Sequence, residues 1–296
     1  METVNPLLEL SNQLRRAVEI GEQAVVAVHG RPHVPSSGVL WRADVVVTTD
    51  HTLKRDEDLT VTLPDGRNLP ATLAGRDAGT DLAVLRLGDA AADAAKTVSE
   101  ASIKVGSLVL ALGRRGANGV SAGFGAIGAI SGPWRTWRGG QIERFIRPDI
   151  NIYTGFSGGA LVDVEGRVIG VNTTGLTRGM GVTIPASTVS RVADELLSRG
   201  RVRRGFLGIG MHPVELPGDR QGLVILSLET NGPAAQAGVV IGDVLVAIDG
   251  DPITETDAVQ LHLGPDSIGT PIQVEILRGG APMTIAVVPA ERPVRE

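Results

Sequence analysis

Short apolar runs separated by glycine, proline and aspartate recur between residues 24 and 184. Runs of this length, rich in valine, isoleucine and leucine and bounded by turn residues, predict β-strands. Pro64-Asp65-Gly66 is typical of a hairpin turn, because proline presets one backbone dihedral and glycine supplies a positive one. About twelve segments fit the strand pattern, and without crossover helices they predict a closed antiparallel architecture. They are 24–28, 38–40, 45–48, 59–63, 71–73, 82–87, 108–112, 124–130, 142–146, 160–162, 168–172 and 182–184.

On both sides of this region lies a segment that is predicted to be a helix. Residues 5–20 carry leucine and valine at helical intervals and end before Gly21, and residues 185–198 predict a second helix that ends before Gly200. After a basic, glycine-rich linker at 200–204 the pattern becomes mixed, with helices and strands following one another in the last third of the chain. The sequence therefore predicts a mainly β first domain and a smaller α+β second domain.

The amino-acid composition limits the classes of function that this protein can have. The chain has 296 residues, of which 42% are apolar, enough for two buried cores. A formal net charge of −5 argues against nucleic acid as the principal partner. With no cysteine, disulfides and thiolate metal sites are excluded, and no grouping of histidines and acids has metal-ligand spacing, so we expect no metal or organic cofactor.

The amino terminus lacks the basic start, apolar middle and small-residue cleavage site of a secretory signal. No apolar stretch reaches the roughly 20 residues of a membrane span. We therefore expect no membrane span and a cytoplasmic protein, although a trimmed protein of the cell envelope would look the same.

The stretch 153–161 places Ser157 in a glycine cluster, with Gly155 two residues before it and Gly158 and Gly159 after it, ahead of an apolar run that begins at Ala160. Glycine permits conformations in which the N–H groups of Gly155 and Ser157 point into one pocket and form an oxyanion hole. The alternative is an ordinary flexible turn between strands.

Two upstream residues favour the catalytic interpretation. His51 ends a β-branched run, so its ring is expected at a strand end facing a cleft, and Asp81 opens an apolar strand. The order His51, Asp81, Ser157 is that of the chymotrypsin-type triad, and this order makes the predicted closed architecture a chymotrypsin-like double β-barrel.

At these residues the chain resembles the HtrA/Deg family of trypsin-like serine proteases. The resemblance implies an N-terminal helical segment (1–22), a protease domain (23–199), the linker (200–204) and a PDZ domain (205–292). It also implies a homo-oligomer such as a trimer, joined through the N-terminal segment; the alternative is a helix that packs on the first barrel. The motifs that carry the resemblance are 37–40, 80–85, 155–163, 166–173 and 181–185, followed by a PDZ-like region with glycine turns at 231–238 and 241–250 and a helix at 257–263.

Two binding sites follow from the resemblance. Phe206, Leu207, Gly208 and Ile209 resemble the PDZ loop whose backbone N–H groups hold the terminal carboxylate of a peptide, while a neighbouring strand edge adds the peptide as a new strand. By the same resemblance, the primary specificity pocket is lined by Ile152, Val171, Asn172 and Thr173. With no acid evident at its base, we expect small aliphatic side chains to be preferred there.

The chain departs from the family pattern beside two of the three triad residues. Phe156 stands where the family usually has asparagine, and Asp50 stands where a small or polar residue is usual. Phe156 could leave the oxyanion turn poorly formed, and Asp50 could alter the charge around His51. Trp134 and Trp137 lie in a glycine-bounded loop that either caps a barrel or contacts a partner.

The resemblance thus implies a serine endopeptidase that cleaves unfolded or damaged polypeptides in protein quality control and binds peptide C-termini through its PDZ domain. The alternative is a scaffold or chaperone-like protein that captures peptide termini while its protease domain is silent.

Overall fold

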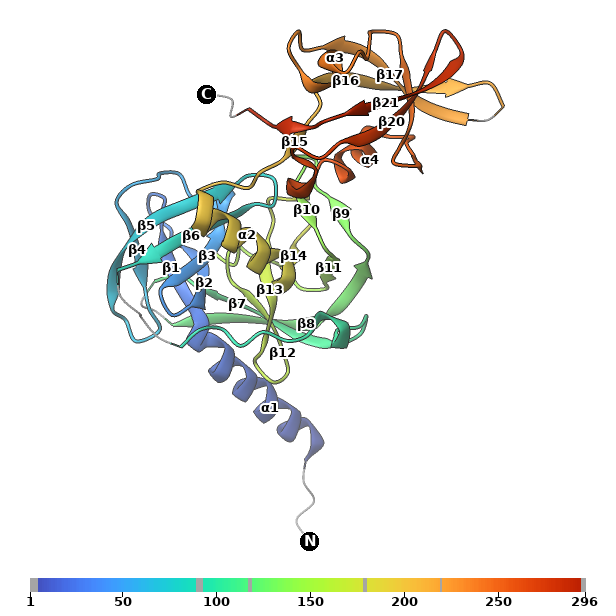
Figure 1. Ribbon diagram of the computed structural model, residues 1–296. Coiled ribbons are helices and arrows are strands. Elements are labelled where there is room, and N and C mark those ends of the chain that lie inside the picture. Colours follow the sequence, from blue (N-terminus) through green and yellow to red (C-terminus); the bar gives the residue numbers. More distant parts are fainter. Residues whose placement is uncertain (1–4, 89–92, 117–118, 178–179, 219, 294–296) are drawn as a thin grey trace. The chain divides into compact units, whose positions relative to one another are not determined.

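The computed structural model describes residues 5–88, 93–116, 119–177, 180–218 and 220–293. The chain folds into two compact units, Met1–Arg201 and Val202–Glu296, which are described separately (Figure 1). The predicted limits of the protease domain, linker and PDZ domain stay predictions at the level of single residues.

The first unit contains two closed antiparallel barrels, which confirms the predicted mainly β, chymotrypsin-like fold. The first barrel has the strand order β1-β2-β3-β6-β5-β4 and is filled by aliphatic side chains such as Val26, Leu40 and Leu85. Its strands are β1 (Val25–His29), β2 (Ser36–Arg42), β3 (Val45–Thr49), β4 (Leu59–Thr62), β5 (Asn68–Asp77) and β6 (Leu82–Leu87).

The second barrel has the order β11-β14-β13-β12-β7-β8. Its core includes Val109, Ile146, Leu161 and Ile169. Its strands are β7 (Leu108–Arg114), β8 (Val120–Ser131), β11 (Phe145–Pro148), β12 (Ala160–Asp163), β13 (Val168–Thr173) and β14 (Val182–Pro185).

The strand predicted at 142–146 is in fact two strands. A hairpin of β9 (Trp134–Arg135) and β10 (Gln141–Ile142) precedes β11. The break falls at Glu143, whose backbone N–H donates to Thr188 Oγ1 (3.1 Å) and whose carboxylate accepts from Arg191 Nε (2.6 Å). In a continuous strand Glu143 would instead take part in the backbone hydrogen bonds between neighbouring strands. Here it bonds to side chains of a neighbouring helix.

The two tryptophans of this hairpin differ. Trp134 is half-buried and meets Phe145 edge to face, with ring centroids 5.5 Å apart. Trp137 is 72% exposed, and the Arg138 guanidinium lies 4.5 Å from its ring centroid. The capping interpretation therefore fits Trp134, whereas Trp137 is open to solvent.

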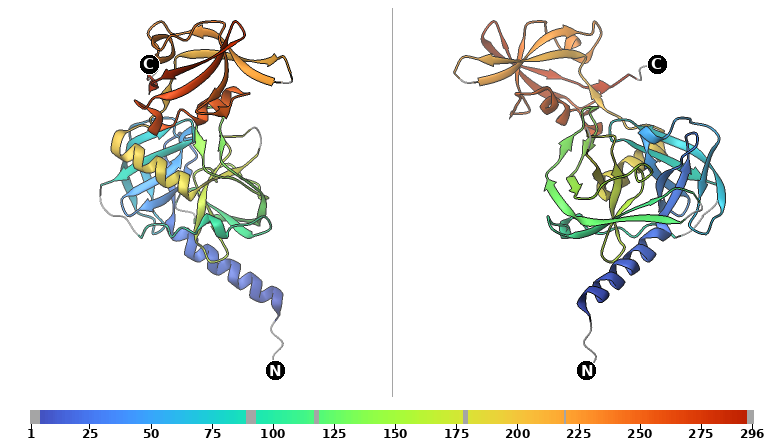
Figure 2. Two further views of the ribbon diagram at one scale, coloured as in Figure 1. Left: turned by 45° about the vertical axis from the view of Figure 1, so that its right-hand side comes forward. Right: turned by 180° about the vertical axis from the view of Figure 1, so that it is seen from behind.

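Helices flank the barrels of the first unit. α1 (Pro6–Gly21) is capped by Asn5, whose side chain accepts from the N–H of Leu7 at 3.1 Å, and it projects from the barrels so that only Ala17 and Gly21 are buried (Figure 2). α2 (Ala186–Arg199) buries one apolar face on the barrels and ends at Gly200, which has a φ of 71°. Short 3-10 turns are η1 (Glu22–Ala24), η2 (Asp50–Thr52) and η3 (Glu100–Ser102).

The second unit is a sheet with the order β16-β17-β18-β20-β21, in which β16 is an edge strand. Its core packs Leu223, Leu245, Val259 and Ile276 between sheet and helices. Its elements are β15 (Gly205–Phe206), β16 (Ile209–Leu216), β17 (Arg220–Leu228), α3 (Pro233–Gln236), β18 (Val244–Ile248), β19 (Asp251–Pro252), α4 (Thr256–Leu261), η4 (Pro265–Ser267), β20 (Ile272–Arg278), β21 (Ala281–Val287) and β22 (Ala290–Glu291).

Among the residues that the structure describes, no helix has both the length and the apolar character needed to cross a membrane.

Candidate active site

His51 and Asp81 meet because β3 and β6 are neighbours. The two strands pair in register through Thr49 and Leu82, which places the turn after β3 beside the turn before β6. His51 Nδ1 lies 2.8 Å from Asp81 Oδ2, and the His51 backbone N–H donates to Asp81 Oδ1 at 2.9 Å. With Nδ1–H donating to the carboxylate, Nε2 is left as the acceptor that a general base requires.

The Asp81 carboxylate is fixed from several directions. Thr173 Oγ1 donates to Asp81 Oδ2, and the Asp81 carbonyl accepts from the Asp50 N–H at 3.1 Å. The carboxylate of Asp77 organises the turn by accepting from both the N–H (2.9 Å) and the hydroxyl (2.7 Å) of Thr80. Asp81 itself is 1% exposed, so its charge is held in place by these donors and not by water.

Asp50, the acidic residue beside His51, is paired. Its carboxylate forms an ion pair with Arg76, and the Arg76 guanidinium also donates to the carbonyls of Asp50 (3.0 Å) and Leu53 (3.1 Å). Burial lowers the pKa of Arg76, but hydrogen bonds and charge attraction to Asp50 and Asp56 outweigh it and raise the pKa above its ordinary value. The extra negative charge next to His51 is therefore compensated.

The loop before Ser157 forms a tight turn. The Phe156 N–H donates to the Tyr153 carbonyl at 3.0 Å, and Gly155, the third residue of this turn, has a φ of 94°. The Phe156 side chain is only 4% exposed because it joins the core of the second barrel. Within the described residues the N–H groups of Gly155 and Ser157 donate to no other group, so both are available to a ligand.

The backbone around Ser157 is clamped to both barrels. The Gly158 N–H donates to the Asn172 carbonyl on β13 at 2.8 Å, and the Ser157 carbonyl accepts from the Ser37 N–H on β2 at 3.2 Å. Gly158 has a φ of 87°, and a β-carbon there would collide with the Ser37 carbonyl and lie 2.6 Å from Thr48 Oγ1. Only glycine fits this position.

The Ser157 hydroxyl faces Thr174, with 3.3 Å between Oγ and Oγ1. Among the described side chains it makes no hydrogen bond to His51. The two residues nevertheless share one crevice. A β-carbon on Gly175, the residue after Thr174, would lie 2.5 Å from Asp81 Oδ2 and 2.7 Å from His51 Nδ1. In a serine protease reaction the Ser157 hydroxyl would have to leave Thr174 and bond to His51 Nε2.

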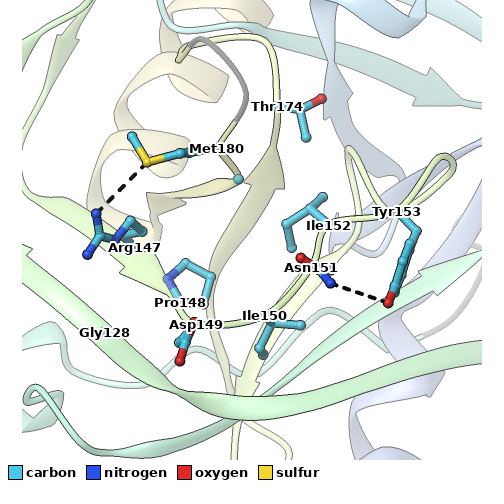
Figure 3. Close-up of a pocket in the computed structure, with 11 residues that line it drawn as sticks. Gly128, Arg147, Pro148, Asp149, Ile150, Asn151, Ile152, Tyr153, Thr174 and Met180 are labelled. Atoms are coloured by element: carbon cyan, nitrogen blue, oxygen red, sulfur yellow. Dashed lines mark hydrogen bonds between the residues drawn. The ribbon is translucent and has the colours of Figure 1, made fainter.

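A cavity of about 710 Å³ opens beside this crevice (Figure 3). Ile152 lines this cavity, and Asn151 Nδ2 lies 3.5 Å from the hydroxyl of Tyr153, another lining residue. Thr174 connects the cavity to Ser157. The lining residues are Gly128, Arg147, Pro148, Asp149, Ile150, Asn151, Ile152, Tyr153, Thr174, Met180 and Gly181.

Three of the four residues predicted for the specificity pocket do not line this cavity. Val171, Asn172 and Thr173 are fully buried in β13. Thr173 directs its hydroxyl to Asp81, and Asn172 Oδ1 accepts from Thr183 Oγ1 at 2.9 Å. An alternating strand pattern does not say which face of a strand meets a pocket, so the predicted set of four residues stays a prediction. Thr174 and Met180, by contrast, carry no motif that singles them out.

The predicted PDZ loop also exposes backbone donors. The Leu207 and Gly208 carbonyls are occupied, since they accept from Ala234 N–H (3.0 Å) and Glu229 N–H (2.8 Å). Their own N–H groups donate to nothing within the described residues, and Gly208 has a φ of 75°. Phe206 ends β15 just before this loop, and Ile209 begins the edge strand β16 just after it. Free donors beside an open strand edge are what the terminus of a peptide needs.

The comparisons with known proteins agree with this geometry. Residues 36–171 match the trypsin-like peptidase domain, and residues 205–288 match the PDZ domain. A probable periplasmic serine endoprotease, DegP-like, from Halomonas elongata is 34% identical over 89% of this chain and 57% of its own length. The periplasmic pH-dependent serine endoprotease DegQ from Escherichia coli is 28% identical over 85% of this chain and 58% of its own. The chain thus spans little more than half the length of these relatives.

Solved structures match along nearly the whole chain. The HtrA-type protease AlgW with a decapeptide has a TM-score of 0.80 and 27% identity, covering 95% of this chain and 99% of that one. The serine endoprotease from Yersinia pestis has a TM-score of 0.78 and 29% identity, covering 95% and 98%.

Paired six-stranded barrels, with a histidine–aspartate pair on one and a serine in a glycine-rich turn on the other, define the class of trypsin-like peptidases. With the PDZ domain and the relatives above, the assignment narrows to one family. The chain belongs to the HtrA/Deg family of serine proteases.

The relatives correct one expectation. Both DegP-like and DegQ proteins are named periplasmic, which points to the periplasm, so the prediction of a cytoplasmic protein is wrong. That prediction relied on the composition of the first residues of the chain, a feature that says nothing of a leader removed or lying upstream.

Proposed function

We propose that this protein is a serine endopeptidase that cleaves unfolded or damaged polypeptides. The observation that carries the proposal is the fixed His51–Asp81 pair beside Ser157, whose loop offers two unused N–H donors. Relatives of the same fold are named serine endoproteases.

The chemistry assigns one role to each group. The Ser157 hydroxyl attacks the scissile carbonyl carbon while His51 Nε2 accepts its proton. Asp81 holds the imidazole in the tautomer required and stabilises the imidazolium. The N–H groups of Gly155 and Ser157 bind the oxyanion, where removal of a single donor typically costs about 3 to 4 kcal/mol of barrier. His51 then returns the proton to the leaving amine, and water releases the acyl group by the same route.

The cavity beside Ser157 is the proposed site for the substrate side chain that precedes the cleaved bond. Ile152 and Met180 supply apolar surface there, while the cavity is also lined by one residue of each charge, Arg147 and Asp149. We propose that the apolar part receives the side chain and prefers small aliphatic residues. Matched peptides that differ only in carrying valine, lysine or aspartate at this position test the preference. Faster cleavage of the lysine or aspartate peptide would contradict it.

The second unit is proposed to bind peptide C-termini. The free N–H groups of Leu207 and Gly208 would hold the carboxylate, and the edge of β16 would pair with the peptide backbone. Calorimetry should show binding of a free-carboxylate peptide and much weaker binding of its amidated form. Equal binding would remove the proposed carboxylate loop.

One observation favours the alternative of a silent, peptide-binding scaffold, because Ser157 contacts Thr174 and not His51. Digestion of β-casein separates the two functions. The wild type should cleave β-casein and the Ser157→Ala variant should not. Absence of cleavage by the wild type in every oligomeric and peptide-activated state would leave the scaffold function standing.

The names of the relatives also support a periplasmic location for this protein, which fractionation of cells that produce it natively tests.

A further inference from the structure

The β9–β10 hairpin ends in a closed tip, residues 136–140. The Thr136 N–H donates to the Gly140 carbonyl at 2.9 Å, and the Gly139 N–H donates to the Thr136 carbonyl at 2.8 Å. Gly139 has a φ of 77°, which suits this tight turn. The tip therefore has a defined shape set by its own backbone bonds.

This tip lies against the turn that carries Asp81. Thr136 Oγ1 donates to the Gly79 carbonyl at 2.7 Å and accepts from the Gly140 N–H at 3.1 Å, so both functions of the hydroxyl are used. Thr136 is only 2% exposed. Gly140 approaches so closely that a β-carbon there would overlap the Gly79 carbonyl group and lie 2.6 Å from Thr80 N.

The Asp81 turn needs such a support. Asp81 has a φ of 57°, a left-handed conformation that aspartate tolerates better than most residues but that still costs free energy, so contacts from the surrounding structure help to hold it. The Asp77 carboxylate holds the turn through Thr80, and the hairpin tip holds it through Gly79. Only Thr80 separates Gly79 from Asp81, whose carboxylate orients His51.

We propose that Thr136 is a positioning residue for the reaction: through its hydrogen bond to Gly79 it fixes the Asp81 turn and so the orientation of His51. The proposal rests on the proposed peptidase function. Thr136 touches neither substrate nor the reacting atoms. Its effect is exerted through the backbone of the turn.

Kinetics of the full-length protein with a fluorogenic peptide test the proposal. Thr136→Val keeps the shape but removes both hydrogen bonds, and kcat should fall about tenfold with KM little changed. Thr136→Ser restores the hydroxyl and should recover most of the loss. Gly140→Ala should lower kcat in the same direction, because its methyl group pushes the turn away.

Trp137→Ala is the matched control, since this exposed neighbour lies in the same tip and should leave kcat and KM unchanged. A second readout does not depend on catalysis. In a Ser157→Ala background, the downfield proton NMR resonance of the His51 Nδ1–H bonded to Asp81 should be present, should shift or broaden with Thr136→Val, and should return with Thr136→Ser.

The outcomes are distinct. If the wild type cleaves peptide but Thr136→Val and Gly140→Ala retain its kcat and the His51 resonance, the positioning role is overturned and the peptidase function stands. If the wild type does not cleave peptide but the resonance still responds to Thr136, the peptidase function fails while the structural link to Asp81 holds. A resonance that is unaffected in both variants overturns the link in either case.

Discussion

Single hydroxyl groups decide how the three proposed catalytic residues meet. Thr173 donates to Asp81, and Thr174, the next residue, contacts Ser157. Neighbouring threonines thus hold the two ends of the proposed proton path. The sequence places His51, Asp81 and Ser157 next to clear apolar runs, which made them predictable. A strand pattern could not tell that the Thr173 hydroxyl donates to Asp81.

The contact between Thr174 and Ser157 leads to a prediction at this scale. Thr174→Val removes the partner that holds the hydroxyl away from His51, and a 3.3 Å neutral hydrogen bond is worth about 0.5 to 1 kcal/mol. The second-order rate of labelling by a serine-directed phosphonate should therefore rise about two- to fivefold. Thr62→Val is the control, because it removes another buried hydroxyl, one on β4 whose partners are His29 and Asn68. A slower reaction of Thr174→Val would instead mean that Thr174 presents the nucleophile.

Phe156 shows how far residue-level reasoning reaches. Its position beside Ser157 is plain in the sequence, and its effect on the oxyanion turn stays a prediction. The side chain lies in the core of the second barrel, and the Phe156 N–H closes the turn on the Tyr153 carbonyl. Whether a large side chain fits a core depends on contacts from distant strands, which no local pattern records.

At the scale of elements, the spacing of apolar residues and the turn residues between them predicted both barrels and both long helices of the first unit. The strand at 142–146 failed because Glu143 bonds to α2, a tertiary contact that overrides local propensity. The β9–β10 hairpin and its contact with the Asp81 turn were consequently invisible in the sequence.

An ion pair in the second unit leads to a prediction about the stability of its sheet at low pH. Arg278 on β20 donates twice to the buried Asp243 carboxylate, at 2.8 Å each, and Val240 N–H adds a bond at 2.9 Å. The hydrogen bonds from Arg278 are the main cause that lowers the pKa of Asp243, against the opposing effect of burial. Because the pKa of Asp243 is lower in the folded protein than in the unfolded chain, where it is about 3.9, the ionised carboxylate stabilises the fold at pH values above about 3.9. This stabilisation is lost as the pH falls through the pKa of the folded protein.

Hydrogen exchange of the β18 and β20 amides, corrected for the intrinsic pH dependence of exchange, measures this effect. Wild-type protection should fall as pH drops below about 4. In the Asp243→Asn variant these amides should already be less protected from exchange at pH 7. Their protection should fall less than that of the wild type when the pH is lowered. Equal pH dependence in both proteins would show that this ion pair does not stabilise the second unit.

At the scale of the whole molecule, α1 leaves large apolar side chains in water. Leu7 is 77% exposed, Leu8 60% and Leu10 41%, on a helix that buries only its last turn. Exposed apolar surface of this kind marks an interface, and we propose that α1 joins copies of the chain into a homo-oligomer such as a trimer.

Light scattering coupled to size exclusion tests this assembly. The wild type should elute as an oligomer, and Leu7→Ser with Leu8→Ser should shift the mass toward the monomer. Ser substitution at Val105, 62% exposed in the loop before β7, is the matched control and should leave the mass unchanged. A monomeric wild type at micromolar concentration would contradict the proposal.

The central claim is that His51 activates Ser157 as a nucleophile. Labelling by a fluorophosphonate, read out by mass spectrometry of the modified peptide, tests it most directly. The account predicts an adduct on Ser157 in the wild type, none in Ser157→Ala, and a rate reduced at least a hundredfold in His51→Ala. Equal labelling of the wild type and His51→Ala, or no adduct on Ser157 in any oligomeric or peptide-bound state, would contradict it.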